Sequence, residues 1–232
     1  GKHMESFYDL LASVDKLGVL FDLPAERQSG MLDVGQLGPI AVDINAVSYS
    51  WPGRQAALNS VSVEIPAKES LAIVGPSGSG KSTLVDVING LRPPTAGHLT
   101  LDGFDPRDLG PDVLRERVAL VRNNEVFHAT IEENVHLHRE DVSSIDVRAA
   151  LERLGLLEQI LQHCDGCETV ISSNGSPLTE NQCRLLSIAR AAVGRPGLLL
   201  IDGVLDALPD AELETVLEFL LSEEQSWTLV LT

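Results

Sequence analysis

The feature that most constrains this chain is the segment at residues 75–83, Gly-Pro-Ser-Gly-Ser-Gly-Lys-Ser-Thr. It fits the pattern G-x-x-x-x-G-K-[ST], in which glycines let backbone N–H groups turn inward around phosphate oxygens. An apolar strand is expected over residues 70–74, and a helix is expected to begin near Gly80, where its positive dipole end faces an anion. Lys81 is then expected to reach the β- and γ-phosphates of a nucleotide, and the Ser82 hydroxyl to contact Mg²⁺. An ordinary glycine-rich turn is the alternative, but the strand–loop–helix context favours an α/β phosphate-loop fold.

A second motif stands far downstream, where the apolar run Leu-Leu-Leu-Ile at residues 198–201 ends in Asp202. An aspartate at the carboxyl end of such a strand holds the magnesium shell in phosphate-loop proteins. Alone this pattern is weak, because any buried strand can end in an aspartate. Paired with the loop, it predicts that Ser82 and Asp202 share a magnesium site.

The remaining pattern predicts alternating strands and helices. Apolar and polar residues alternate from 40 to 65 around a Pro52-Gly53 turn, which predicts antiparallel strands, and a further strand pair is expected at 98–101 and 118–121. Helical periodicity is expected at 6–22, 131–137, 145–154, 156–162, 180–193 and 211–221, with a last strand at 228–231. This order predicts a mainly parallel sheet with a helical insert.

Charge and composition exclude several classes of function. Lys plus Arg number 17 against 34 Asp plus Glu, a net charge of −17, which argues against nucleic-acid binding and against a polybasic membrane anchor. No apolar run approaches the length of a membrane span. Residues 1–4 resemble a tag remnant, no secretory signal follows, and three cysteines make no disulfide framework, so a reducing, cytoplasmic setting is expected.

With both motifs in place, the chain from about residue 42 to residue 232 resembles the nucleotide-binding domain of ATP-binding cassette (ABC) transporters, most closely the exporter branch. The resemblance implies a P-loop NTPase core with an antiparallel β-subdomain and an α-helical subdomain at about 124–190. Residues 5–41 are then expected to be the tail of a preceding transmembrane domain in the same polypeptide. Packing of the helix at 6–22 on its own domain is the alternative. A head-to-tail dimer at the cytoplasmic face of a membrane is implied as well.

The resemblance also implies ATP and Mg²⁺ as ligands and assigns roles to individual residues. Trp51 matches the aromatic residue that stacks on adenine, although a half-buried strand aromatic is the alternative. Asn123, or Asn124 if the alignment is shifted, matches a glutamine that contacts Mg²⁺ and the attacking water; a plain loop asparagine is the alternative. The residues that match nucleotide contacts in the loop are Gly75, Ser77, Gly78, Ser79, Gly80, Lys81, Ser82 and Thr83.

Two departures from the family pattern bear on catalysis. Gly203 stands where the family has its catalytic carboxylate, and loss of a general base costs on the order of 10²–10⁴-fold in rate; nearby Asp206 is expected to be a solvated acid. The family signature Leu-Ser-Gly-Gly-Gln reads Leu-Thr-Glu-Asn-Gln at residues 178–182. Glu180 would repel a phosphate there, whereas Thr179 with Gln182 predicts a helix capping box.

In a head-to-tail pair each ATP site combines the phosphate loop of one chain with the signature of the other. Because both departures lie on one chain, neither a homodimer nor a pairing with an intact partner leaves an unimpaired site. The expected function is therefore the ATP-binding domain of an exporter with weak or absent hydrolysis. A non-hydrolysing ATP-sensing regulatory or scaffold module is the alternative.

Overall fold

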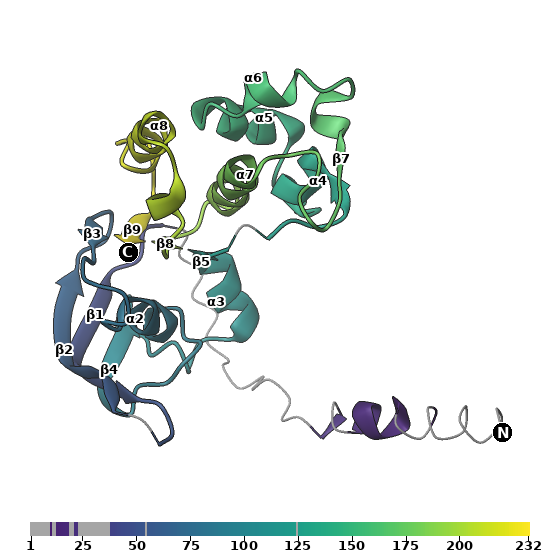
Figure 1. Cartoon of the computed structure of the whole chain (residues 1–232). Coiled ribbons are helices and arrows are strands. Elements are labelled where there is room, and N and C mark those ends of the chain that lie inside the picture. The colour runs from purple at the N-terminus through teal and green to yellow at the C-terminus, as the bar shows by residue number, and fades with distance from the viewer. Residues whose placement is uncertain (1–9, 11–12, 19–20, 23–37, 54, 124) are drawn as a thin grey trace.

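The computed structural model of the chain describes residues 10, 13–18, 21–22, 38–53, 55–123 and 125–232. Figure 1 shows a β-rich part that contains β1, β2 and β4, and a helical part that contains α4 to α7. The strands form an antiparallel sheet, a parallel sheet and a short two-stranded pair. The predicted α/β fold with an antiparallel β-subdomain and a helical subdomain is confirmed.

The antiparallel sheet consists of β1 (Val42–Ser50), β2 (Ala56–Ile65) and β4 (Ala96–Leu101), in the order β2-β1-β4. Alternate residues of β1, among them Val42 and Ile44, are buried, because successive side chains of a strand point to opposite faces. The hairpin predicted around the Pro52-Gly53 turn is therefore confirmed.

The parallel sheet has the strand order β3-β9-β8-β5: β3 (Ser70–Ala72), β9 (Thr228–Leu231), β8 (Leu198–Ile201) and β5 (Val118–Val121). All four residues of β8 are buried, as expected for a central parallel strand covered on both faces. The prediction that the strands at 98–101 and 118–121 pair with each other is wrong. The first belongs to β4 and pairs with β1, whereas β5 pairs with β8 after the unpredicted helix α3 (Pro111–Arg117).

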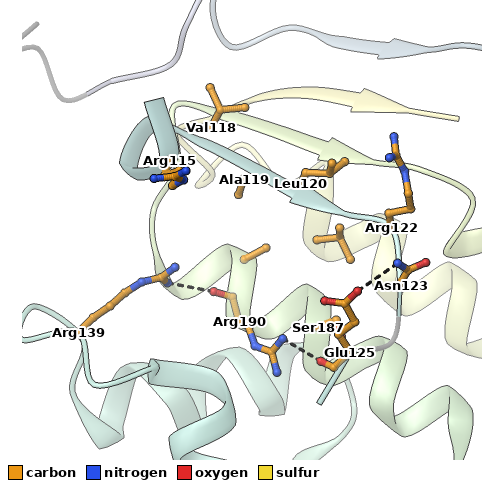
Figure 2. A pocket seen from close by; sticks show the side chains of 12 residues that line it. Arg115, Val118, Ala119, Leu120, Arg122, Asn123, Glu125, Arg139, Ser187 and Arg190 are labelled. Atoms are coloured by element: carbon orange, nitrogen blue, oxygen red, sulfur yellow. Dashed lines mark hydrogen bonds between the residues drawn. The ribbon is translucent and has the colours of Figure 1, made fainter. Parts of the chain in front are cut away.

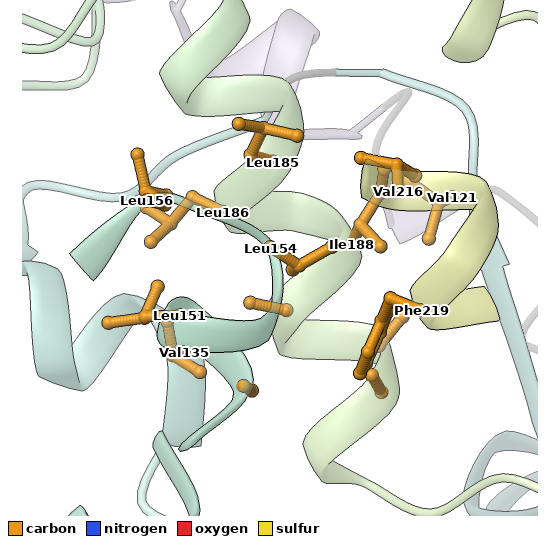
Figure 3. Packing of buried hydrophobic residues seen from close by; sticks show 14 of the residues in the cluster. Val121, Val135, Leu151, Leu154, Leu156, Leu185, Leu186, Ile188, Val216 and Phe219 are labelled. Atoms are coloured by element: carbon orange, nitrogen blue, oxygen red, sulfur yellow. The ribbon is translucent and has the colours of Figure 1, made fainter. Parts of the chain in front are cut away.

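The helices pack in two hydrophobic cores. Helix α2 (Lys81–Ile88) follows the loop and buries its apolar side chains with residues of both sheets. Helix α7 (Glu180–Val193) lies at the centre of a second core, in which Leu186 and Ile188 pack with apolar residues of the neighbouring helices (Figure 3). The other elements are β6 (Ala129–Thr130), α4 (Ile131–His136), α5 (Ser144–Arg153), α6 (Leu157–Ile160), η1 (Gly166–Glu168), β7 (Val170–Ile171), η2 (Leu205–Ala207) and α8 (Asp210–Leu220).

The helix predicted over 6–22 is described only in part, because residues 6–9, 11–12 and 19–20 lie outside the described residues. Residues 13–18 are helical, and all of them are exposed, including the apolar Val14 and Leu17. Among the residues described, no helix combines the length and the apolar character needed to cross a membrane.

Candidate functional site

The phosphate loop lies between β3 and α2, as the sequence predicts. The Lys81 ammonium bends back over the loop, and its Nζ donates to the carbonyl oxygens of Gly75 at 2.7 Å and Pro76 at 3.2 Å. An ammonium has three donors and no acceptor. The structure therefore places one positive charge over a loop that is followed at once by the N-terminus of α2.

Two glycines of the loop have left-handed backbone conformations for different reasons. Gly80 has φ +98°, and a Cβ added to it would come within 2.5 Å of the carbonyl oxygen of Ala57 in β2. Gly78 has φ +81°, but a Cβ there would meet no atom within 4 Å. The loop thus needs glycine at Gly78 for its backbone conformation, and at Gly80 also for its close approach to β2.

Ser82 and Asp202, the two residues predicted to share magnesium, lie in contact. The Ser82 hydroxyl donates to Asp202 Oδ1 at 3.0 Å, and the Thr232 hydroxyl donates to the same oxygen at 2.6 Å. Asp202 is buried, which disfavours its charged form. Hydrogen bonds from Thr232, Arg122 and Ser82 outweigh this effect and hold the pKa of Asp202 below its usual range.

The second oxygen of Asp202 is taken by an arginine that the sequence analysis missed. Arg122 Nε lies 2.6 Å from Asp202 Oδ2, and Arg122 Nη2 lies 2.7 Å from Asp86 Oδ1 on α2. Partial burial works against the charged form of Arg122, but its bonds to Asp86 and Asp202 raise its pKa above the ordinary value. The sheet register explains the encounter: Val121 pairs with Ile201 in parallel, so the residues that follow them are neighbours.

Magnesium, which the family resemblance implies, needs near-octahedral oxygen ligands and is usually held through one or two carboxylates. Asp202 and the Ser82 hydroxyl have suitable oxygens. However, the carboxylate of Asp202 is already neutralised by the guanidinium of Arg122 at ion-pair distance. In this arrangement the residues do not fit a magnesium ion held by Asp202.

Trp51 lies at the turn after β1, half-buried, with its ring edge-on to Tyr49 at a centroid distance of 5.5 Å. The guanidinium carbon of Arg92 lies 4.1 Å from the centroid of the Trp51 ring, and Arg92 Nε pairs with Asp86 Oδ2 at 2.7 Å. Asp86 therefore lies between Arg92 and Arg122. Through it, the predicted adenine and magnesium positions are joined by one network of charges.

Asn123 faces a cleft of about 390 Å³, and its amide donates to Glu125 Oε1 at 3.2 Å (Figure 2). In Figure 2 the side chain of Arg122 points away from that of Asn123. The structure thus brings Arg122, rather than Asn123, to Asp202. Asn124, the other candidate for this position, lies outside the described residues.

Gly203 has φ +68°, and a Cβ added to it would meet no atom within 4 Å. Its backbone N–H donates to the Thr232 hydroxyl at 3.1 Å. The position predicted for a catalytic carboxylate is thus open, with a backbone conformation that favours glycine. Asp206 lies one short turn further, in η2, and is exposed.

The N-terminus of α7 is capped by side chains of its own first turn. Thr179 Oγ1 accepts from the Gln182 backbone N–H at 3.3 Å, and the Gln182 side chain accepts from the Thr179 N–H at 2.8 Å, which confirms the predicted capping box. The exposed Glu180 pairs with Arg184 one turn along, and Arg184 also donates to Asn181 at 2.6 Å. A carboxylate, not a glycine backbone, thus lies in the first turn.

The chain is similar to known proteins in both sequence and fold. The profile of the ABC transporter family matches residues 58–205. An ATP-dependent lipid A-core flippase of Ralstonia nicotianae is 37% identical over 210 residues, which cover 87% of this chain and 35% of the relative. A mitochondrial potassium channel ATP-binding subunit of Rattus norvegicus is 34% identical over 195 residues, covering 82% of this chain and 27% of that protein.

A solved structure described as a bacterial Atm1-family ABC exporter with ATP bound superposes with a TM-score of 0.83 at 25% identity. The match covers 99% of this chain and 41% of the exporter chain. The chain spans about a third of the length of the curated relatives that it matches.

Proposed function

Since this chain belongs to the ABC transporter family, we propose that it is the ATP-binding domain of an exporter-type transporter and that it hydrolyses ATP weakly or not at all. The proposal that the chain binds ATP is supported by the loop at residues 75–83, where two carbonyl oxygens hold the Lys81 ammonium over the loop. A nucleotide phosphate offers that ammonium a charged acceptor in place of two neutral ones, which is the stronger hydrogen bond.

The proposed nucleotide lies along the charged network. Its phosphates contact the loop from Gly75 to Thr83, and its adenine stacks on Trp51, a flat apolar surface suited to a purine. Arg92 already lies against this ring. The adenine either takes the free ring surface or displaces the guanidinium.

Weak hydrolysis is supported by two features of this chain. Gly203 has no side chain with which to activate water, and the first turn of α7 presents Glu180, whose charge is only partly met by Arg184 because the carboxylate is exposed. A phosphate that approaches this turn from a partner subunit meets a negative charge, and like charges brought together cost several kcal/mol.

The partners are proposed from the family and from the share of the relatives that the chain covers. We propose a head-to-tail dimer with another nucleotide-binding domain, at the cytoplasmic face of a membrane. In this proposal residues 42–232 are the domain, with its helical subdomain at about 124–190, and residues 5–41 link it to a preceding transmembrane domain. The exposed apolar side chains of Val14 and Leu17 support a partner for that segment.

A second candidate is a non-hydrolysing module that senses ATP. It is favoured by the same Gly203 and Glu180, because a sensor needs affinity for ATP but no turnover.

Two measurements on the purified protein test these proposals: ATP affinity by calorimetry, and phosphate release with Mg-ATP. Binding without turnover is expected in the wild type, and loss of binding in Lys81→Ala. Robust turnover that Lys81→Ala abolishes would contradict weak hydrolysis, whereas no heat with ATP or ADP would refute the nucleotide site itself. Assay in the full-length transporter separates the candidates, because an exporter domain then couples ATP to transport and a sensor does not.

A further inference from the structure

The guanidinium of Arg122 makes three polar contacts at the predicted magnesium position. Its Nε pairs with Asp202 at 2.6 Å, and its Nη2 pairs with Asp86 at 2.7 Å and donates to the Ser82 carbonyl oxygen at 3.2 Å. Two of these three partners, Ser82 and Asp202, are the residues predicted to hold magnesium. The guanidinium thus lies at the same carboxylate that a metal ion would use.

The pairing of Arg122 with Asp202 follows from the register of the parallel sheet. Arg122 directly follows β5, Asp202 directly follows β8, and the Asp202 backbone N–H donates to the Val121 carbonyl at 2.8 Å. Asp202 and Asp86 are both buried, at 5% and 7% exposure, and their carboxylates face two arginines, Arg92 and Arg122. Each of these two buried carboxylates therefore has an arginine partner.

We infer that Arg122 provides the positive charge that a magnesium ion otherwise provides at this ATP site, so that the chain binds ATP equally well with and without a divalent cation. The inference rests on the proposed ATP site. Where magnesium is bound in phosphate-loop proteins, it bridges phosphate oxygens and neutralises their charge. An arginine provides one positive charge and a planar fork of donors that suits phosphate oxygens.

The donors of Arg122 suffice for both tasks. Within the part of the chain that the structure describes, its bonds to Asp202, Asp86 and Ser82 use Nε and Nη2, and in this inference Nη1 donates to a phosphate oxygen. Together with Lys81 on the loop, two side-chain cations then face the nucleotide. A divalent ion added at Asp202 would have to displace the guanidinium from a buried carboxylate, and Arg122 would lose the partner that positions it.

The test is calorimetric titration of ATP into the purified chain, once with excess Mg²⁺ and once with EDTA. In the wild type the two dissociation constants are expected to agree within about threefold. Arg122→Gln keeps the size and some of the hydrogen bonds but removes the charge, and is expected to weaken metal-free binding by about tenfold or more while Mg²⁺ restores it. Arg122→Lys keeps the charge without the fork and is expected to lie between the two.

Arg107→Gln is the matched control, because it removes the same charge from an exposed arginine that pairs with Asp105. It is expected to leave both constants unchanged, and circular dichroism checks that each variant is folded. Wild-type binding that weakens about tenfold or more in EDTA would overturn this inference and leave the proposed ATP site standing. Absence of ATP binding under both conditions would overturn the site and this inference with it.

Discussion

Replacement of Gly80 by alanine tests how the phosphate loop is held against the antiparallel sheet. At Gly80 the new Cβ meets two obstacles: a backbone φ of +98°, and the Ala57 carbonyl oxygen at 2.5 Å. Gly78→Ala meets only the first, because φ is +81° and no atom lies within 4 Å of its Cβ. The pair therefore separates the cost of the backbone conformation from the cost of the close approach.

The magnitudes follow from these two terms. A non-glycine residue in the left-handed region costs about 1–2 kcal/mol, which is the expected loss of unfolding free energy for Gly78→Ala. Overpacking against a backbone atom adds about 1–3 kcal/mol, because β2 must move to relieve the contact. Gly80→Ala is thus expected to lose about 2–5 kcal/mol in all.

Urea unfolding followed by the fluorescence of the two tryptophans measures the difference. Trp227 is buried next to β9, so its environment changes when the sheet unfolds. A parallel titration with ATP is expected to show weaker binding in Gly80→Ala than in Gly78→Ala, because relief of the contact shifts the start of α2. Equal unfolding free energies for the two variants would refute the claim that the approach of Gly80 to β2 restricts this position.

Three further outcomes are expected. Gly203→Glu fits the open space with a loss of about 1–2 kcal/mol in unfolding free energy. It is expected to raise phosphate release from ATP by up to about 10²–10⁴-fold; an unchanged rate would show that the missing carboxylate does not limit turnover. Since the folded-state pKa of Asp202 is lowered, its charge stabilises the fold above about pH 4 and this contribution is lost as the pH falls through the folded value. The stability gap between wild type and Asp202→Asn in urea titrations should therefore narrow on acidification, and a gap that widens would contradict the assignment. Asn134, fully buried, bonds to the backbone N–H and carbonyl of Phe127, so Asn134→Ala should lower the unfolding free energy by about 2–4 kcal/mol, whereas a loss below about 0.5 kcal/mol would show that these groups find other partners.

Prediction from sequence succeeded where the signal is local. The helix over residues 180–193 and its capping box were predictable because helical periodicity and the Thr179–Gln182 spacing span only a few residues. Prediction failed for strand pairing, which joins segments that are far apart in the sequence. The strands at 98–101 and 118–121 were both expected, yet they belong to different sheets, because strand pairing depends on the topology between them.

The amino-acid sequence by itself determined that this chain folds around a phosphate loop, since the glycines, Lys81 and Ser82 are consecutive and their chemistry depends on that order. Only the tertiary structure decided which cation lies on Asp202. Arg122 and Asp202 are 80 residues apart, and they meet because β5 and β8 run side by side in register. Such a register is set by the packing of the whole sheet, so neither residue carries a local signal of the other.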